Sequence, residues 1–242
     1  MDRRWEAVFL DLGGVVLDLA SVQRARRLFL DRLDAAFDVP TAKPDETWKR
    51  VLGEYFRERE GTTFRPAREG YALAVNEILD EDVDAGSWWP LFVETAGEAL
   101  APVENAPETI RNLDEAGYYL ALVSDIDAWE AEYILQLFDV RGCFDDVTTS
   151  EEVGWTKPAP EIFETAIRKA GVDPGQSLYV GDRYENDMTG GKRAGFQTVA
   201  FGSDAASGAS APGSEGTVDD SVVDFVVDDI RDLLSIADVD PR

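Results

Sequence analysis

The sequence predicts an α/β fold, in which a parallel sheet carries helices on both faces and a helical segment is inserted. Several short apolar runs end in turn-forming residues and alternate with helical stretches, as parallel strands with covering helices require. Two of these runs are followed by an aspartate, Asp11 and Asp182. The alternation is interrupted between residues 20 and 100, where only helical periodicity remains.

The predicted strands are short, and most are apolar. The first covers about residues 7 to 10, and the later strands are expected at 119–123, 147–149, 178–180, 198–201 and 225–227. Together they predict a Rossmann-like core formed by residues 1–19 and 101–242.

Residues 20–100 predict a helical cap inserted into this core. Apolar residues three and four apart favour helices at 24–37, 46–59, 67–79 and 87–100. We expect such a cap to close over a substrate and to exclude water. Its aromatic side chains could line a pocket, although aromatic residues on helices belong more often to a core; they are Trp48, Tyr55, Phe56, Trp88 and Trp89.

A segment near the C-terminus differs in composition from the rest of the core. Residues 202–217 are rich in Gly, Ser and Ala, include Asp204, and have few large apolar side chains. This composition predicts a flexible loop within the core.

Composition excludes several classes of catalytic site. The 242 residues, 44% of them hydrophobic, are enough for a sizeable core. Without any histidine, the chain cannot build a Ser-His-Asp triad, a Cys-His pair or a histidine metal centre. Its single cysteine, Cys143, excludes an internal disulfide and a multi-cysteine zinc site. Carboxylate chemistry remains.

The charge is strongly negative, with a formal net charge of −26 and only five lysines among the 23 cationic residues. Such a surface disfavours binding to nucleic acids or anionic membranes and suits a cytoplasm of high ionic strength, which screens self-repulsion. We therefore expect a salt-adapted (halophilic) source. No apolar run approaches the roughly 20 residues of a membrane span, and the opening Asp2-Arg3-Arg4 precedes a strand, so we expect a cytoplasmic location.

Acidic residues at the strand ends indicate the chemistry. In a parallel α/β sheet the carboxyl ends of the strands share one crevice, where ligands bind. If Asp11, Asp182 and Asp187 gather there, their mutual repulsion requires a cation, and hard oxygen ligands favour Mg²⁺. This arrangement predicts phosphoryl transfer to an aspartate.

Four motifs occur in order over nearly the whole chain. They are Asp11-Leu12-Gly13-Gly14-Val15-Val16, Leu122-Val123-Ser124-Asp125, the segment 153–163 around Lys157-Pro158, and Val180-Gly181-Asp182-Arg183-Tyr184-Glu185-Asn186-Asp187 continuing to Gly195. In this combination the chain resembles the haloacid dehalogenase superfamily, in the branch of phosphatases with a helical cap after the first strand.

The resemblance implies a role for each acid. Asp11 would be the nucleophile that forms an aspartyl phosphate, and its second oxygen would bind Mg²⁺. The carbonyl group of Gly13 and the carboxylates of Asp182 and Asp187 would complete the metal site. Position alone is equally compatible with Asp187 being a helix N-terminal residue that interacts with the dipole.

The resemblance also implies a phosphate-binding set. Ser124 would donate its hydroxyl to a phosphate oxygen, aided by the amide of Asp125 at a helix start, although each could be a simple cap. Lys157 would reach back to the phosphate and to Asp11, which makes it both a catalytic and a phosphate-binding candidate.

The chain departs from the family two residues after the nucleophile. Phosphatases of this family usually carry a second aspartate there, which protonates the leaving group, whereas this chain has Gly13. General acid catalysis is worth about 10² to 10⁴ in rate, so alkyl esters should turn over slowly unless another group compensates. Candidate substitutes are Asp18, Asp125 and Asp127.

Three functions remain open. The first is a Mg²⁺-dependent phosphatase of small phosphorylated metabolites, which the acidic pair Asp182 and Asp187 favours. The second is a 2-haloacid dehalogenase, which needs neither a metal nor a second aspartate. The third is a catalytically weak pseudoenzyme that binds a phosphorylated ligand, as Gly13 would allow. The sequence leaves the oligomeric state open.

Overall fold

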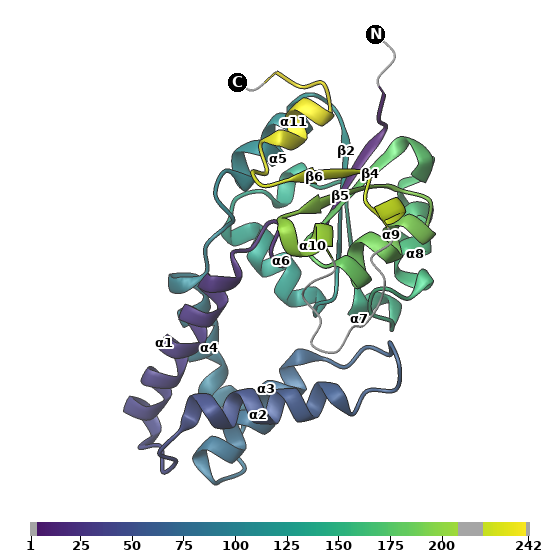
Figure 1. Ribbon diagram of the computed structural model, residues 1–242. Helices are drawn as coiled ribbons and strands as arrows, with labels where there is room; N and C mark the ends of the chain where they lie inside the picture. The colour runs from purple at the N-terminus through teal and green to yellow at the C-terminus, as the bar shows by residue number, and fades with distance from the viewer. Residues whose placement is uncertain (1–3, 208–219, 241–242) are drawn as a thin grey trace. The chain divides into compact units, whose positions relative to one another are not determined.

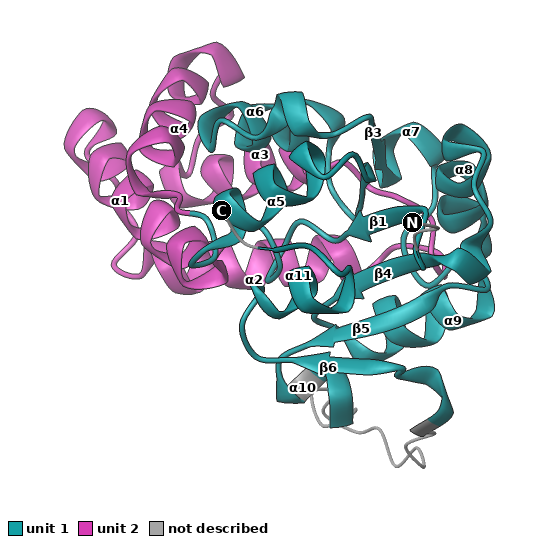
Figure 2. Cartoon of the chain, turned by 90° about the horizontal axis from the view of Figure 1, so that it is seen from above, with its two compact units in different colours: residues 1–17, 102–242 teal, residues 18–101 magenta. Residues whose placement is uncertain are grey.

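The computed structural model describes residues 4–207 and 220–240, and the chain forms two compact units. One unit comprises Met1–Leu17 and Pro102–Arg242, and the other comprises Asp18–Ala101. Figure 2 shows the first in teal and the second in magenta.

The first unit is built on a six-stranded sheet in which every neighbouring pair is parallel, in the order β3-β2-β1-β4-β5-β6. The strands are β1 (Ala7–Leu10), β2 (Tyr119–Ser124), β3 (Asp146–Thr149), β4 (Ser177–Gly181), β5 (Gln197–Phe201) and β6 (Phe225–Val227). Short, mostly apolar runs thus form strands where the sequence predicts them, and the α/β, Rossmann-like fold class is confirmed.

Strand β1 lies at the centre of the sheet and fixes the place of the site. Leu10 pairs with Leu122 of β2 on one side and with Val180 of β4 on the other. The amide of Asp11 donates to the carbonyl oxygen of Val180 at 2.9 Å, which carries the pairing one residue further. The chain moves outward from β1 in both directions, so the carboxyl ends of β1, β2 and β4 border a topological switch point.

Helices cover both faces of this sheet (Figure 1). They are α5 (Ala106–Glu115), α6 (Ala128–Leu137), α7 (Ser150–Val153), α8 (Pro160–Ala170), α9 (Gly190–Arg193), α10 (Ser203–Ser207) and α11 (Asp232–Ile236), with a π-helix at Tyr184–Thr189. On one face Phe9, Phe163, Tyr179 and Phe196 belong to a single buried cluster. On strand β1 the side chains alternate, so Val8 and Leu10 are buried on the opposite face.

The predicted flexible loop differs in its first part. Residues 203–207 form helix α10, and the methyl group of Ala205 is fully buried in the core cluster. Small alanines can pack closely even where mean hydropathy is low, so composition alone does not reveal this helix. The remainder of the predicted loop, residues 208–217, lies outside the described residues.

The second unit consists of four helices, α1 (Leu19–Phe37), α2 (Pro44–Arg57), α3 (Ala67–Leu79) and α4 (Ala85–Ala99), with α1 packed on α4 and α2 packed on α3. Helix α1 begins five residues before its predicted start, because the carboxylate of Asp18 accepts from the amides of Ala20 and Ser21.

The core of this unit is aromatic. Its buried centre is formed by Phe29 with Trp48 and Trp88, and Phe92 packs against it. Tyr55 is also buried, whereas Phe56 and Trp89 are partly exposed. Among the helices within 4–207 and 220–240, none is both long and apolar enough to cross a membrane.

Candidate active site

Asp11 follows the central strand and is almost completely buried, with 2% of its surface exposed. Its Oδ1 accepts from the amide of Leu12 at 2.7 Å and lies 3.0 Å from the Lys157 ammonium. Burial alone would raise the pKa of Asp11, but Lys157, Arg183 and a hydrogen bond from Ser124 hold it below its usual value. Asp11 is therefore an ionised carboxylate at neutral pH.

Asp182 follows β4 and lies directly against the turn after β1. Gly14 in that turn has a φ of +75°, and a Cβ atom there would lie 1.9 Å from Asp182 Oδ2. Only glycine accommodates both the backbone conformation and the approach of the acid. Burial and the nearby charges of Asp11 and Asp187 raise the pKa of Asp182 to about 6.

Asp187 lies in the π-helix after β4 and is fully buried. A Cβ atom at Gly181 would lie 2.2 Å from the Cβ of Asp187, so a second glycine gives this acid its space. The amide of Arg183 donates to Asp187 Oδ2 at 3.0 Å. Burial raises the pKa of Asp187, and Asp11 adds to the effect.

The three acids that the sequence singles out therefore converge. One carboxylate oxygen of each of Asp11, Asp182 and Asp187 lies within 4.8 Å of the other two. This donor set fits Mg²⁺, since the ligands are all carboxylate oxygens. Burial, together with the neighbouring acids, raises the pKa of Asp182 and of Asp187, and a bound cation would offset this cost. The set supports the predicted metal ligands, with the carbonyl group of Gly13 as a further candidate from the same turn.

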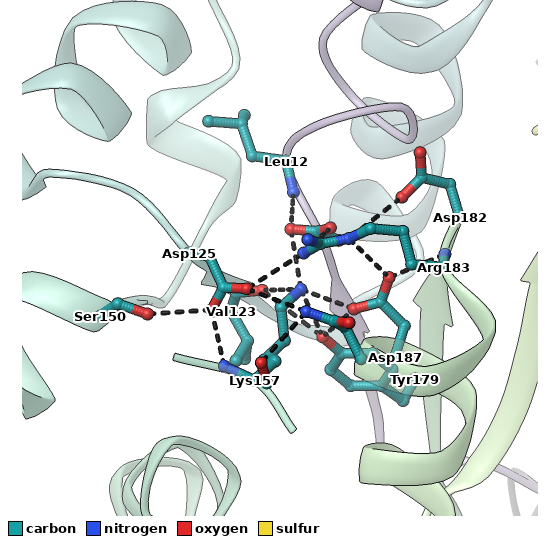
Figure 3. A network of polar contacts seen from close by, with 11 residues as sticks. Leu12, Val123, Asp125, Ser150, Lys157, Tyr179, Asp182, Arg183 and Asp187 are labelled. Atoms are coloured by element: carbon teal, nitrogen blue, oxygen red, sulfur yellow. Dashed lines mark hydrogen bonds and ion pairs between the residues drawn. The ribbon is translucent and has the colours of Figure 1, made fainter. Parts of the chain in front are cut away.

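Lys157 occupies the centre of the site and is 1% exposed. Its ammonium group bridges Asp11 and Asp187, at 3.0 and 2.6 Å. It also donates to the hydroxyl of Tyr179 at 3.1 Å and to the carbonyl oxygen of Val123 at 3.3 Å (Figure 3). Burial alone would lower the pKa of Lys157, but the two acids raise it well above its usual value, so the cation is permanent.

Ser124 ends β2 and is 5% exposed. Its hydroxyl hydrogen-bonds the Asp11 carboxylate, which lowers the pKa of that acid. Its place beside the nucleophile agrees with the role the sequence predicts for it, which stays a proposal.

Asp125 has a different role from the one expected of a free acid. Its Oδ1 accepts from the Ser150 hydroxyl at 2.9 Å and from the Lys157 amide at 2.7 Å. Its Oδ2 accepts from Arg183 at 3.1 Å and from Asn186 at 3.5 Å. The side chain thus joins the ends of β2, β3 and β4 through their loops, as Figure 3 shows.

The other two candidate substitute acids also have local structural roles. Asp18 caps helix α1 with both carboxylate oxygens, and Arg24 approaches one of them at 3.3 Å. Asp127 is fully buried at the start of α6, where the indole of Trp129 donates to it at 3.4 Å. Neither contact places a proton donor beside Gly13, so the identity of the acid stays a prediction to be tested.

Two site residues escaped the sequence reasoning. The Arg183 guanidinium lies among the acids, and the Tyr179 hydroxyl, besides accepting from Lys157, lies 3.3 Å from Asp187. Arg183 directly follows Asp182, so a cation within an acidic motif was the available signal. Tyr179 occurs inside a strand of otherwise apolar or small residues, where an aromatic ring usually signals only core packing.

Comparison with known proteins places these motifs in a family. A family model for haloacid dehalogenase-like hydrolases matches residues 5–195. The glyceraldehyde 3-phosphate phosphatase of Methanopyrus kandleri is 36% identical over 146 residues, which cover 60% of this chain and 60% of that protein. Haloacid dehalogenase-like hydrolase domain-containing protein 3 of Bos taurus is 34% identical over 139 residues, 56% of this chain and 51% of that protein. The match spans about half to three fifths of these relatives.

Solved structures agree on the fold. The HAD-hydrolase YfnB from Bacillus subtilis, bound to magnesium, has a TM-score of 0.70 at 20% identity and covers 98% of this chain and 100% of its own. A HAD phosphatase from Thermococcus onnurineus gives 0.67 at 22% identity with 98% and 100% coverage. On the strength of the family match over most of its length, this chain belongs to the haloacid dehalogenase-like hydrolases.

Proposed function

We propose that this hydrolase is a Mg²⁺-dependent phosphatase of small phosphorylated metabolites that works through an aspartyl-phosphate intermediate on Asp11. The observation that carries the proposal is the convergence of three carboxylates around a buried lysine at the switch point of the sheet. One relative supports the substrate class, since it is a phosphatase of glyceraldehyde 3-phosphate.

Asp11, Asp182 and Asp187 are the residues that would hold the metal. When bound, Mg²⁺ supplies positive charge that neutralises the acids and the phosphoryl group. Without such charge, a dianionic phosphate would be repelled from three carboxylates.

The chain's own groups prepare Asp11 for attack. The Leu12 amide and the Lys157 ammonium fix its carboxylate from one side and keep it ionised. The carboxylate then forms an oxygen–phosphorus bond while the ester bond from phosphorus to the leaving group breaks. Water attacks the same phosphorus in the second step, which releases phosphate and restores Asp11.

Lys157 and Ser124 supply the polar contacts for the phosphoryl oxygens. Lys157 carries a permanent charge beside Asp11, and Ser124 presents a hydroxyl at the end of the adjacent strand. Both are fixed by buried strands and loops, so they need little rearrangement as charge develops on the phosphoryl group.

Gly13 determines which leaving groups we expect. No carboxylate at that position can protonate a leaving alkoxide, and the Asp125 carboxylate is engaged by four donors. We propose that acyl and aryl phosphates, whose leaving groups need no proton, are hydrolysed faster than alkyl esters.

The test is phosphate release from p-nitrophenyl phosphate, an acyl phosphate and a panel that includes glyceraldehyde 3-phosphate, in high salt. We expect turnover with Mg²⁺ and its loss with EDTA. Asp11→Asn should reduce turnover by about 10⁴-fold or more with an unchanged circular dichroism spectrum. Halide release from 2-haloacids without metal would replace the proposal with a dehalogenase. Ligand binding without turnover would favour the pseudoenzyme.

Gly13→Asp tests the missing acid directly. Gly13 does not have a positive φ, so an L residue is compatible with its backbone. We expect the variant to raise kcat for alkyl phosphates by about 10²-fold or more and to leave aryl phosphates nearly unchanged. An equal effect on both classes would show that protonation of the leaving group is not limiting.

A further inference from the structure

We propose that Arg183 is a fixed counter-cation that weakens Mg²⁺ binding and strengthens binding of the phosphoryl group, so that it sets the balance between the two ligands. This inference rests on the proposed function and deepens it. It makes Arg183 a substrate-positioning residue, a role that the four sequence motifs do not imply.

The guanidinium group of Arg183 lies within ion-pair distance of four carboxylates. Its contacts are to Asp125 Oδ2 at 3.1 Å, Asp11 Oδ2 at 3.8 Å, Asp187 Oδ2 at 3.8 Å and Asp182 Oδ1 at 3.9 Å. Lys157 approaches Asp11 through Oδ1, so the two cations lie on different oxygens of the nucleophile. Figure 3 shows the arginine lying across the acids.

Exposure separates the two cations. Lys157 has 0% of its side chain exposed, whereas Arg183 has 44% exposed. Lys157 is therefore a built-in part of the core, and Arg183 borders both the acids and solvent.

The arginine is held in place at both ends. Its backbone amide donates to Asp187 Oδ2, and its guanidinium donates to Asp125. Asp125 is itself fixed by the Ser150 hydroxyl and the Lys157 amide. Because these partners come from the loops after β2, β3 and β4, the side chain is preorganised rather than loosely paired.

The charge balance explains why this position matters. Four carboxylates, those of Asp11, Asp125, Asp182 and Asp187, face the two cations Lys157 and Arg183, which leaves a net charge of about −2. A divalent cation would bring the site close to neutrality, in which state a phosphate dianion can enter. Without Arg183 the site would attract a metal more strongly and would still repel phosphate after the metal is bound.

Arginine is also suited chemically to the second ligand. Its planar fork donates to two oxygens of a phosphate or a carboxylate, and it keeps its charge when partly buried. A metal that neutralises Asp11, Asp182 and Asp187 would weaken their attraction for the guanidinium group. Its N–H groups could then donate to a phosphate, while the ion pair with Asp125 keeps the side chain at the site.

The experiment measures the two ligands separately. Mg²⁺ affinity is measured by calorimetry without substrate, and phosphate affinity is measured as the inhibition constant of inorganic phosphate at saturating Mg²⁺. For Arg183→Gln we expect Mg²⁺ to bind about three- to tenfold more tightly and phosphate about tenfold or more weakly. Arg183→Lys, which keeps the charge, should restore the Mg²⁺ affinity and only part of the phosphate affinity.

The matched control is Arg193→Gln, which removes the same charge from an exposed arginine of α9. It should leave both constants within about twofold, because exposed charges are largely screened. A damaged fold would weaken both ligands together, so opposite shifts identify an electrostatic role. Shifts in the same direction, or unchanged Mg²⁺ affinity, would overturn the inference.

The outcome also separates this inference from the proposed function. If the native protein binds Mg²⁺ and releases phosphate from esters but Arg183→Gln shows no opposite shifts, only the role of Arg183 is wrong. If the native protein fails to bind Mg²⁺ at all, the proposed function and the inference both fall.

Discussion

The two units of the chain treat charge in opposite ways. In the α/β unit the side chains of Asp11, Lys157 and Asp187 are at most 3% exposed and form one ion network. In the helical unit the ion pairs between described residues are at least partly exposed, as between Arg50 and Glu54, with 46% and 50% of these side chains exposed. Burying ions costs several kcal/mol for each charge unless geometry compensates. The molecule therefore bears the cost of burying ions at its site and avoids it in the helical unit.

The aromatic core of the helical unit is the counterpart of that network. Phe29 packs against the rings of Trp48 at 5.7 Å and Phe92 at 5.2 Å, and all three residues come from different helices. Non-directional burial of apolar surface holds this unit together, whereas paired charges hold the centre of the site.

The largest effect should come from removing the buried cation. Lys157→Met leaves Asp11 and Asp187 without their shared partner, and breaking a buried pair typically costs about 3–5 kcal/mol of unfolding free energy. Turnover should be lost as well. Urea unfolding and phosphate release measure the two effects. Lys169→Met, whose lysine forms more exposed pairs with Asp146 and Glu152, is the control and should cost much less.

The aromatic core should be nearly as sensitive in stability but not in chemistry. Phe29→Ala removes a large ring from the buried cluster and should cost about 3 kcal/mol or more. The pH dependence of the remaining turnover should be unchanged, because Phe29 belongs to the other compact unit and its ring packs against Trp48, Trp88 and Phe92, which do not titrate. A shift in the pH profile would break the contrast between the two units.

A third prediction concerns a partly buried acid of the α/β unit outside the ion network. Burial and the nearby Asp127 raise the pKa of Glu130 to about 8. Between pH 5 and 8 the folded protein keeps a proton that the unfolded chain releases, so this group makes stability fall as pH rises, by at most about 1.4 kcal/mol per pH unit.

Glu130→Gln should remove this dependence. We expect melting temperatures equal to those of the native protein at pH 5 and higher than those at pH 9. Glu164→Gln, at an exposed position of α8, is the matched control. A variant that loses stability equally at both pH values would show that Glu130 has a partner which holds it ionised.

The smallest effect should come from a surface pair of the helical unit. Arg50 on α2 pairs with Glu54 and with Glu77 of α3. Arg50→Gln should change the free energy of unfolding by about 1 kcal/mol or less, and less still in high salt. A larger loss that persists in high salt would mean that the helical unit depends on specific ion pairs after all.

The periodicity of apolar residues was enough to predict the strands and helices of the molecule, and the acids after two strands indicated where the site lies. The six strands and the helical insertion needed only the alternation of apolar runs, and the geometry of a parallel sheet brings Asp11 and Asp182 to one edge. The position of Asp187 alone was equally compatible with a helix N-terminus, so its place beside the other two acids needed the family resemblance. The shared edge of the sheet turns distant positions in the chain into neighbours.

The rest depended on side-chain partners that no spacing reveals. Asp18 was predicted as a candidate acid because it lies near the start of the helical segment. An aspartate just before a helical stretch is also a helix-capping signal, and the Ser21 amide does donate to Asp18. The structural role of Asp125 could not be recognised, because its four donors lie 25 to 61 residues further along the chain. The role of Arg183 could not be predicted either, because its partners Asp11 and Asp125 are distant in sequence.

Two glycines give the site a further property. At Gly14 and Gly181 a single methyl group would collide with Asp182 or Asp187. A genetic screen for inactive alleles should thus recover alanine at these positions as readily as loss of an acid, although every reactive group would still be encoded. The lack of a side chain at Gly14 and Gly181 is therefore as necessary to the site as the acidic side chains themselves.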